Sequence, residues 1–272
     1  KRAEERQLRV SDGVLAQVMR EELVILDADN GKRFWSRKAK DELGFVHPIV
    51  AGETFYVAEG RYSRRSSYTH WPMCTPDFIH AFDLKTGKPK WTFKWSDQDW
   101  GEAHAVYNLQ VENDLIGGAV TMRTEGKPQA HGLVLDARTG KVIYWGRQND
   151  AWPGSTGAGH SHVRMLLRGN DVWTMDIASP IARWDVEKPA EFLSFTKTYK
   201  GQIRPVACTV WRSTPNWWYG GVAAYPMSAE GRPHLSGSGR SGCDIGAFPA
   251  NGLLYSPPNA CACQPYLPGN KV

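Results

Sequence analysis

Three histidines in the middle of the chain have the residue type and spacing of a ligand or acid–base cluster. His160 and His162 are separated by one residue, and His104 lies two residues after Glu102. Alternate residues of a β-strand point to the same side, so each pair would present its side chains together. Such imidazoles could bind a divalent transition metal, hold a substrate carboxylate or transfer protons. The alternative is that each imidazole only hydrogen-bonds a loop carbonyl.

Three long polar stretches carry a second group of residues with binding chemistry, at positions 60–76, 96–103 and 144–161. Indole rings can stack on sugars, and Arg can hold a carboxylate through two parallel hydrogen bonds. The candidate ligand-binding residues are Arg61, Arg64, His70, Trp71, Trp100, Glu102 and Trp152. The alternative for the aromatic residues is that they pack between neighbouring sheets.

The five cysteines include a group near the end of the chain, Cys243, Cys261 and Cys263. Cys261 and Cys263 cannot easily bond to each other, because the ring would be strained. We expect one of them to form a disulfide with Cys243 in an oxidising compartment. A thiolate metal site built from all three is the alternative.

Composition favours an all-β protein of 272 residues. The chain has 12 Trp, 27 Gly and 17 Pro, and aromatic residues favour strands while Gly and Pro favour the turns between them. The net charge of +5 is spread along the chain, whereas nucleic-acid binding requires a concentrated basic face. No apolar run approaches the roughly 20 residues that span a bilayer.

The charged first residues, 1–6, lack the apolar region of a signal peptide. We therefore expect a mature or trimmed form that is a piece of a longer polypeptide.

A repeated motif organises the first two thirds of the sequence. It is built around Asp27, Asp83 and Asp136, which are 56 and 53 residues apart, and a weaker copy spans 181–189. Each of the three strong copies has an apolar run, then Asp, a turn with Gly four residues later, and a second run that ends in Trp. Asp accepts hydrogen bonds from the backbone of such a turn, and Gly tolerates a positive φ. Each copy therefore predicts a tight hairpin with Trp on its second strand.

A second turn precedes each motif, at 11–13, 51–53, 112–114 and 168–171. Each repeat then has four short antiparallel strands, which is one blade of a β-propeller. The prediction is an all-β propeller with about five or six blades, forming one domain over 1–272 and possibly part of a larger ring. Residues 197–272 are expected to form degenerate blades with a Cys-rich end. A different all-β sandwich is the alternative.

The motif resembles the tryptophan-docking repeat of the PQQ-like family of quinoprotein dehydrogenases and of their non-enzymatic relatives, such as the BamB scaffold. The resemblance covers roughly residues 8 to 195 and is strong in three copies. The segment 240–263 is similar to one in large PQQ-like proteins of planctomycete-type bacteria. The sequence has no Cys-x-x-Cys-His motif, so covalent c-type haem is not expected. It also has no adjacent cysteine pair, which many quinoprotein alcohol dehydrogenases have, and no recognisable calcium-ligand set. These two departures argue against bound PQQ, and no cofactor-binding residue is predicted.

In a propeller, the histidines fall near the start of the innermost strand of successive blades. His104 lies ten residues before Asp114, and His160 and His162 lie eleven and nine before Asp171. His47 does not share this register but could point into the same channel. The predicted metal ligands are His47, His104, His160 and His162, and the predicted catalytic residues are His104, Tyr107, His162 and Arg164.

Three functions are compatible with this pattern. The first is a periplasmic or extracellular binding or scaffold propeller, with its working face formed by the long loops between the second and third strands (B–C) and between blades (D–A). Its ligand could be a polysaccharide or a protein, and other chains could complete the ring. The second is a carbohydrate-active enzyme resembling polysaccharide lyases, with a His or metal site near the axis. The third is a quinoprotein dehydrogenase.

Overall fold

The computed structural model describes the backbone in the segments 6–19, 21–40, 42–62, 74–101, 103–124, 127–147, 164–169, 171–175, 182–185, 188–194, 202–206, 209–214, 221–226, 234–236, 248–250 and 253–255. The chain divides into two compact units. The first consists of Lys1–Asp150 with Leu167–Asn170, and the second of Ala151–Leu166 with Asp171–Val272. The expectation of one domain over 1–272 stays a prediction.

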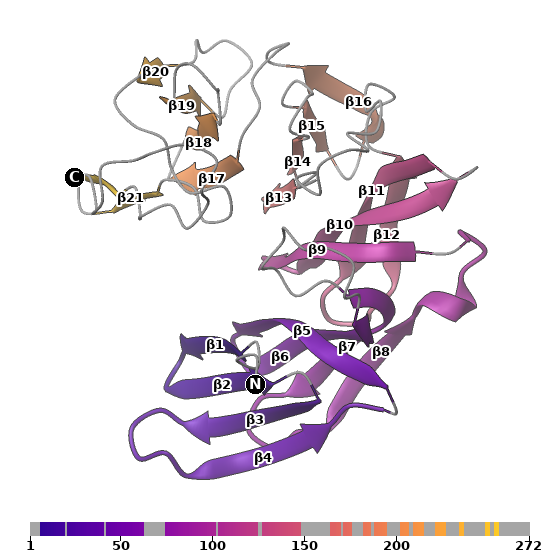
Figure 1. The fold of residues 1–272 in the computed structure, drawn as a ribbon, viewed down its shortest axis with the longest axis vertical. Helices are drawn as coiled ribbons and strands as arrows, with labels where there is room; N and C mark the ends of the chain where they lie inside the picture. Colours follow the sequence, from indigo (N-terminus) through magenta and orange to yellow (C-terminus); the bar gives the residue numbers. More distant parts are fainter. Residues whose placement is uncertain are drawn as a thin grey trace. The chain divides into compact units, whose positions relative to one another are not determined.

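Three four-stranded antiparallel sheets make up most of the first unit (Figure 1). Sheet 1 contains β1 (Arg6–Ser11), β2 (Val14–Met19), β3 (Glu22–Asp27) and β4 (Arg33–Lys38). Sheet 2 contains β5 (Leu43–Ala51), β6 (Thr54–Tyr62), β7 (Cys74–Asp83) and β8 (Pro89–Lys94), followed by a 3-10 turn, η1 (Trp95–Asp97). Sheet 3 contains β9 (Ala103–Glu112), β10 (Leu115–Thr124), β11 (Lys127–Asp136) and β12 (Val142–Arg147).

The rest of the chain has the same kind of strand order. One four-stranded sheet contains β13 (Arg164–Arg168), β14 (Asp171–Met175), β15 (Ala182–Asp185) and β16 (Lys188–Ser194). Another contains β17 (Gln202–Val206), β18 (Thr209–Thr214), β19 (Gly221–Pro226) and β20 (His234–Ser236). A final hairpin pairs β21 (Phe248–Ala250) with β22 (Leu253–Tyr255). The predicted four-stranded antiparallel unit is confirmed. In the segments that the structure describes, no helix is long and apolar enough to cross a membrane.

The repeated turns have the predicted hydrogen bonds. Asp83 Oδ1 accepts from the Thr86 amide at 2.8 Å and from the Thr86 hydroxyl at 2.6 Å, and these bonds hold the pKa of Asp83 below its ordinary value. The Gly87 amide donates to the Asp83 carbonyl at 2.9 Å. Gly31, Gly87 and Gly140 have φ of 72°, 68° and 72°, which favours Gly over any residue with a Cβ.

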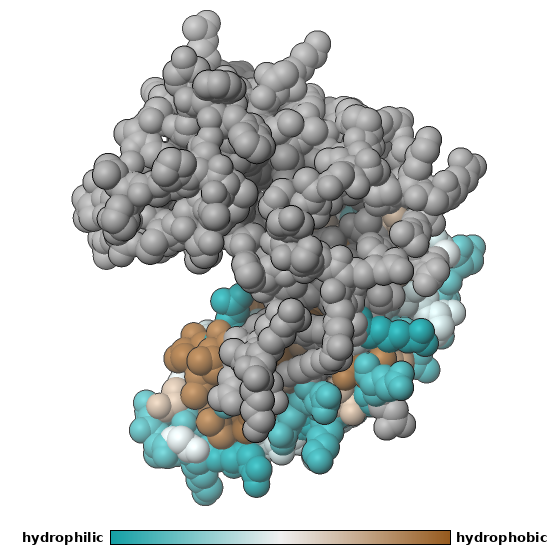
Figure 2. Space-filling model, in the orientation of Figure 1, coloured by the Kyte–Doolittle hydropathy of each residue, from teal (hydrophilic) through white to brown (hydrophobic). Residues whose placement is uncertain are grey.

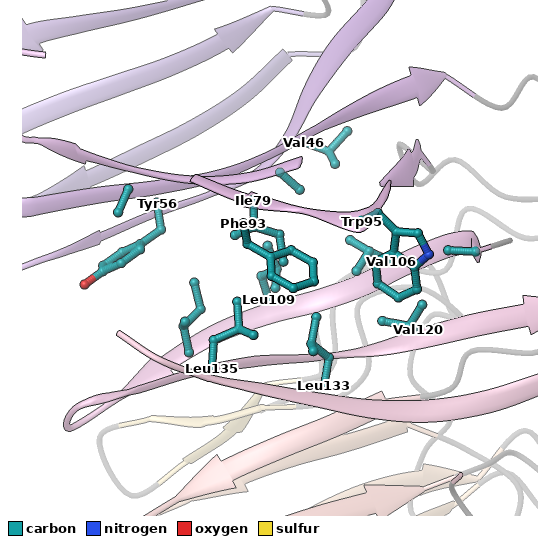
Figure 3. Close-up of a cluster of buried hydrophobic side chains, with 14 of the residues drawn as sticks. Val46, Tyr56, Ile79, Phe93, Trp95, Val106, Leu109, Val120, Leu133 and Leu135 are labelled. Atoms are coloured by element: carbon teal, nitrogen blue, oxygen red, sulfur yellow. The ribbon is translucent and has the colours of Figure 1, made fainter. Parts of the chain in front are cut away.

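Two apolar cores lie between successive sheets, because alternate side chains of each strand point to opposite faces. In β6, Phe55 and Val57 pack in the core shared by sheets 1 and 2. Tyr56 and Ala58, the residues between and after them, pack in the core shared by sheets 2 and 3 (Figure 3). Sheet 2 is therefore covered on both faces, as expected of a blade between two others.

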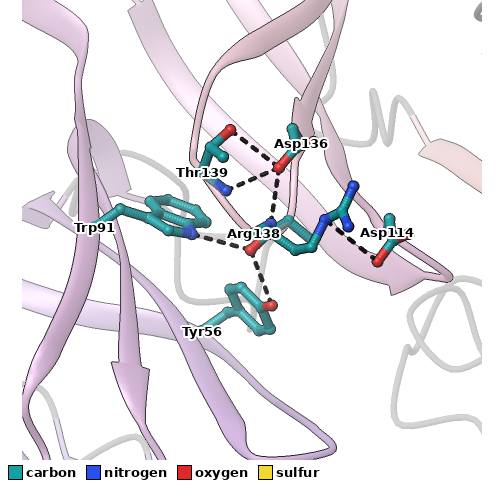
Figure 4. Close-up of polar contacts among 7 residues, drawn as sticks. Tyr56, Trp91, Asp114, Asp136, Arg138 and Thr139 are labelled. Atoms are coloured by element: carbon teal, nitrogen blue, oxygen red, sulfur yellow. Dashed lines mark hydrogen bonds and ion pairs between the residues drawn. The ribbon is translucent and has the colours of Figure 1, made fainter.

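The tryptophan of each of the first two motifs packs on the turn of the next sheet. Trp35 Nε1 donates to the Leu84 carbonyl at 2.8 Å, and Trp91 Nε1 donates to the Ala137 carbonyl at 2.9 Å (Figure 4). The rings lie against the turn glycines so closely that a Cβ built on Gly87 or Gly140 would be 2.6 Å from a ring carbon. We call such a turn a docking turn. The carbonyl one residue after its Asp accepts the indole N–H, and the Gly four residues after its Asp contacts the ring.

The third motif differs from the prediction. Tyr144 pairs with Val134 in the position where Trp35 pairs with Ile25 and Trp91 with Ala81, so Tyr144 occupies the docking position. Trp145 comes one residue later and points to the opposite face of its sheet, where it packs against the core between sheets 2 and 3. The expectation that Trp ends this motif as in the other two is therefore wrong by one residue.

Close packing of Trp91 on Gly140 predicts a difference between two glycines of equal backbone conformation. Gly140→Ala and Gly31→Ala each force Ala to φ 72°, at a cost of about 1–2 kcal/mol. Gly140→Ala also drives a methyl group into the Trp91 ring, which should cost about 1–3 kcal/mol more. Nothing described lies within 4 Å of a Cβ on Gly31. Urea unfolding of both variants measures the difference, and equal losses would contradict this account of docking.

Candidate functional site

The structure places three predicted catalytic residues on the first strands of two sheets. His104 and Tyr107 lie on β9, with Tyr107 opposite Ala119 of β10, and Arg164 begins β13. The first strands of sheets 1, 2 and 3 lie next to one another. His104 is the second residue of the first strand of sheet 3, as the spacing predicted.

Several predicted residues lie outside the part of the chain that the structure describes. These are Arg64, His70, Trp71, Glu102, Trp152, His160, His162, Cys243, Cys261 and Cys263. Their metal, disulfide and ligand-binding roles stay predictions. In the described segments, no three His, Cys, Asp or Glu side chains are grouped so that they could hold a metal ion.

His47 makes a bond between the first strands of two sheets. It lies at a β-bulge in β5, between the paired residues Val46 and Ile49, and has φ 58°. Its Nε2 lies 3.1 Å from the Val106 carbonyl of β9, an arrangement in which Nε2–H donates. Burial lowers the pKa of His47 from 6.5 to about 4, although the bond to Val106 opposes this shift. The imidazole is therefore neutral at pH 7.

Trp100 packs inside an aromatic cluster. Its ring stacks on Trp145 with centroids 4.2 Å apart and planes 6° apart, and Trp95 meets both rings edge-on at 5.4 Å. Trp145 also stacks on His131, with ring centroids 4.7 Å apart. One face of the Trp100 ring is thus covered by another indole.

Charged residues gather where β6 ends and β7 begins, next to the long connection from Tyr62 to Cys74. Arg61 is exposed on β6, and the half-buried Asp77 lies on β7. Burial raises the pKa of Asp77, and the positive charge of Arg61 partly offsets this effect. The exposed Lys40 lies in the short connection between sheets 1 and 2, and its Nζ is 4.0 Å from the centre of the Phe78 ring. We call this region the loop end of sheet 2.

A buried line of polar groups lies directly beneath the loop end. His80 Nε2 is 2.7 Å from Glu59 Oε2, and His80 Nδ1 is 3.0 Å from the exposed Thr92 hydroxyl. Glu59 and His80 are only 1% and 3% exposed. Glu59 Oε1 also accepts from the Lys40 amide at 2.6 Å. Burial would raise the pKa of Glu59, but its bonds to His80 and Lys40 outweigh this effect and lower it.

This arrangement holds the His80 imidazole in place but does not expose it to solvent. A hydroxyl, an imidazole and a carboxylate in line are the components of an activated nucleophile. Here, however, the His80 ring is enclosed between Phe78 and Phe82, with centroids 5.5 and 5.4 Å away. We infer that the line positions the end of sheet 2 and that Thr92 is its outer, solvent-facing member.

Sequence reasoning overlooked Glu59, Asp77 and His80. The signal for His80 is its place between Phe78 and Phe82 on alternate residues of β7, a single polar residue on an apolar strand face. Such a residue requires a buried partner. Nothing in the strand pattern identifies Glu59 as that partner, because it lies 21 residues away.

No protein-family model matches the sequence of this chain, and no curated protein sequence does. Among solved structures, BamB from Moraxella catarrhalis matches with a TM-score of 0.52 and 14% identity over 85% of this chain and 63% of BamB. A europium-containing methanol dehydrogenase matches with a TM-score of 0.57 and 10% identity over 85% of this chain and 61% of the dehydrogenase. The acylaminoacyl peptidase of Pyrococcus horikoshii matches with a TM-score of 0.59 and 13% identity over 92% of this chain and 42% of the peptidase.

These matches establish the fold. The chain spans about three fifths of the length of BamB and of the methanol dehydrogenase. At such identities, similarity extends to the fold alone. With the sheet order above, the chain has an all-β propeller fold of four-stranded antiparallel blades, like those of BamB and the quinoprotein dehydrogenases.

Breaking the Glu59–His80 pair should strongly destabilise the first unit. His80→Leu leaves a buried carboxylate without its imidazole partner, which costs about 3–5 kcal/mol of unfolding free energy. The double variant Glu59→Met with His80→Leu should recover most of this loss. Thr92→Val, the control at the exposed end, should lose about 1 kcal/mol. Urea unfolding measures all three; a double variant no more stable than His80→Leu would contradict the assignment.

The pKa of His47 predicts a dependence of stability on pH. Because its folded-state pKa of about 4 lies below the ordinary 6.5, the unfolded chain holds the extra proton between these values. Stability should therefore fall as the pH drops from 6.5 to 4, by up to about 1.4 kcal/mol per pH unit from this group. His47→Asn tolerates the left-handed backbone and should flatten this part of the curve. A curve that keeps its slope in the variant would exclude His47 as the source.

Proposed function

We propose that the chain is a binding or scaffold propeller of the PQQ-like type, located in the periplasm or outside the cell. Its ligand is an acidic segment of another protein, which binds at the loop end of sheet 2. The observation that carries this proposal is the difference between the two ends of sheet 2. The turns between β5 and β6 and between β7 and β8 are short, whereas at the other end the long connection from Tyr62 to Cys74 joins β6 to β7.

The turn end is tied together by the same backbone bond in three sheets. Each bond joins the amide one residue after the motif Asp to a carbonyl in the preceding turn. The three pairs are Ala28 with Gly13 at 2.8 Å, Leu84 with Glu53 at 3.0 Å, and Ala137 with Asp114 at 2.7 Å. A rigid end of this kind supports loops at the opposite end, where binding residues are commonly found.

Positive charge at the loop end supports an acidic ligand. Arg61 and Lys40 are both exposed there, and the connection from Tyr62 to Cys74 contains Arg64 and Arg65. The guanidinium group of Arg matches a carboxylate with two parallel hydrogen bonds. Carboxylates of Asp and Glu side chains are thus the chemistry that this end would recognise.

A polysaccharide rich in uronic acids offers the same carboxylate chemistry. We favour a protein ligand because Trp100, predicted to stack on a sugar ring, already has one face against Trp145 at 4.2 Å. The resemblance of the repeat to BamB-type scaffolds agrees with this choice.

The proposal predicts charge-dependent binding at one end of the sheet. Arg61→Glu should weaken the binding of a glutamate-rich peptide at least tenfold, because an attraction becomes a repulsion. Arg138→Glu makes the same change at the turn end, where Arg138 is 72% exposed and only 3.8 Å from Asp114 in a weak surface pair. This control should bind like the parent. Biolayer interferometry at two salt concentrations measures both affinities.

Two results would contradict the proposal. Equal weakening by both substitutions would show attraction to the net charge rather than to the loop end. Tighter binding of polygalacturonate than of the peptide, with release of unsaturated sugar products, would favour the lyase-like function instead.

A further inference from the structure

A row of three stacked rings lies on the face of β7 that is turned towards sheet 1. The His80 ring lies between Phe78 and Phe82, with centroids 5.5 and 5.4 Å away. Arg37 of β4 covers one end of the row, since its Cζ is 4.8 Å from the centre of the Phe82 ring. Lys40 covers the other end, with its Nζ 4.0 Å from the centre of the Phe78 ring. Each cation is thus one ring away from the His80 imidazole.

The neighbouring strand β8 places a hydroxyl and a third cation beside this row. Thr92 is paired with His80, and Lys94 with Phe78. Side chains of directly paired residues lie on the same face of a sheet, and Thr92 and Lys94 are both exposed. Across from them, Figure 2 shows hydrophilic residues along β4, the strand that carries Arg37.

This set of side chains has the composition of an anion site, with three cations and one hydroxyl. We call it the edge group, and its members are Arg37, Lys40, Thr92 and Lys94. It lies next to the loop end of sheet 2, with which it shares Lys40.

The hydrogen bond between Thr92 and His80 can run in either direction, and protonation of the imidazole decides which. Burial raises the pKa of Glu59, but its bonds to His80 and Lys40 lower it overall, so Glu59 Oε2 is an ionised acceptor for His80 Nε2–H at 2.7 Å. In the neutral ring, Nδ1 then carries no hydrogen and accepts from the Thr92 hydroxyl at 3.0 Å. In the imidazolium, Nδ1–H donates instead, and the Thr92 O–H is left to donate to a ligand.

We propose that the edge group binds one oxyanion of a ligand and that this binding takes up a proton at His80. An oxyanion requires donors, and the Thr92 hydroxyl becomes an available donor only when His80 is protonated. For its natural ligand the inference rests on the proposed function, since a carboxylate of the same acidic segment would reach the edge group.

The charges near His80 give this coupling its direction. The charged groups on the elements packed against it are Arg37 of β4, Lys40, Glu59 and Arg61 of β6, Asp77 of β7, and Lys90 and Lys94 of β8. The cations oppose an imidazolium, whereas the carboxylates favour it. Lys90 is directed to the turn end, where its Nζ donates to the Glu53 carbonyl at 3.0 Å and to the Thr54 hydroxyl at 2.7 Å. A bound oxyanion offsets the nearby cations, so protonation and binding strengthen each other, and affinity rises as the pH falls.

Sulfate is the probe, because its charge stays constant between about pH 5.5 and about pH 7.5, where imidazoles titrate. An NMR titration of the full chain with sodium sulfate at constant ionic strength follows the amide signals of Thr92 and Lys94. We expect sulfate to bind at least about threefold more tightly at the lower pH, since the imidazolium frees the Thr92 donor.

Four variants identify the groups involved. Thr92→Val removes the hydroxyl, so binding should weaken and the two affinities should become equal. Thr92→Ser keeps the hydroxyl and should keep the difference. Lys94→Gln should weaken binding at both pH values. Lys141→Gln makes the same charge change at an exposed residue of the sheet 3 turn, and this matched control should bind like the parent.

Three results would overturn the proposal: equal sulfate affinities of the parent at both pH values, a pH dependence that survives Thr92→Val, or signals of Thr92 and Lys94 that sulfate leaves unchanged. The glutamate-rich peptide separates this inference from the proposed function. A peptide that displaces sulfate from Thr92 would support both. Sulfate that binds as expected but is not displaced by the peptide would support the edge group as an anion site and contradict the proposed ligand.

Discussion

The structure depends on one contact, the packing of an indole ring on a glycine of the next sheet. Trp91 illustrates how much this contact specifies. Its ring requires the absence of a Cβ on Gly140, and its N–H requires the Ala137 carbonyl, which also accepts from the Tyr56 hydroxyl at 3.1 Å. An apolar ring alone would pack in many orientations. The added hydrogen bond selects one orientation, and so sets the spacing between the two sheets.

The glycine has two roles that happen to coincide. The hairpin needs a residue with positive φ, and the neighbouring sheet needs a surface without a side chain. Since a single Gly meets both needs, the local turn and the long-range contact are encoded at the same position. Because one residue serves both purposes, three motifs are easy to find in a chain that matches no family model.

How far the fold could be predicted depends on how far apart in the sequence the interacting residues lie. Turn hydrogen bonds reach only three or four residues, so Asp83 and Gly87 could be interpreted from their neighbours. The direction of Trp145 also follows from the sequence, because it lies nine residues after Asp136, whereas Trp35 and Trp91 lie eight after their motif Asp, and all three sheets share the same register irregularity. The Glu59–His80 pair could not be predicted, since it joins two strands that the long connection from Tyr62 to Cys74 separates in the sequence. At the loop end, Arg61 was predicted to bind a ligand from its residue type, and that role stays a prediction, whereas the half-buried Asp77 required the structure.

A β-bulge in β5 has a consequence for how this sheet could change by insertion or deletion. Val46 and Ile49 are three residues apart, but they pair with Ala58 and Tyr56, which are two apart. The extra residue lets Val46 and Ile49 pack against the same core, between sheets 2 and 3, and it directs Val50 to the other. Deleting one residue here would therefore turn the end of β5 over. Side chains that now pack in one core would then point to the other. Length at this point of the chain is therefore under stricter constraint than residue identity.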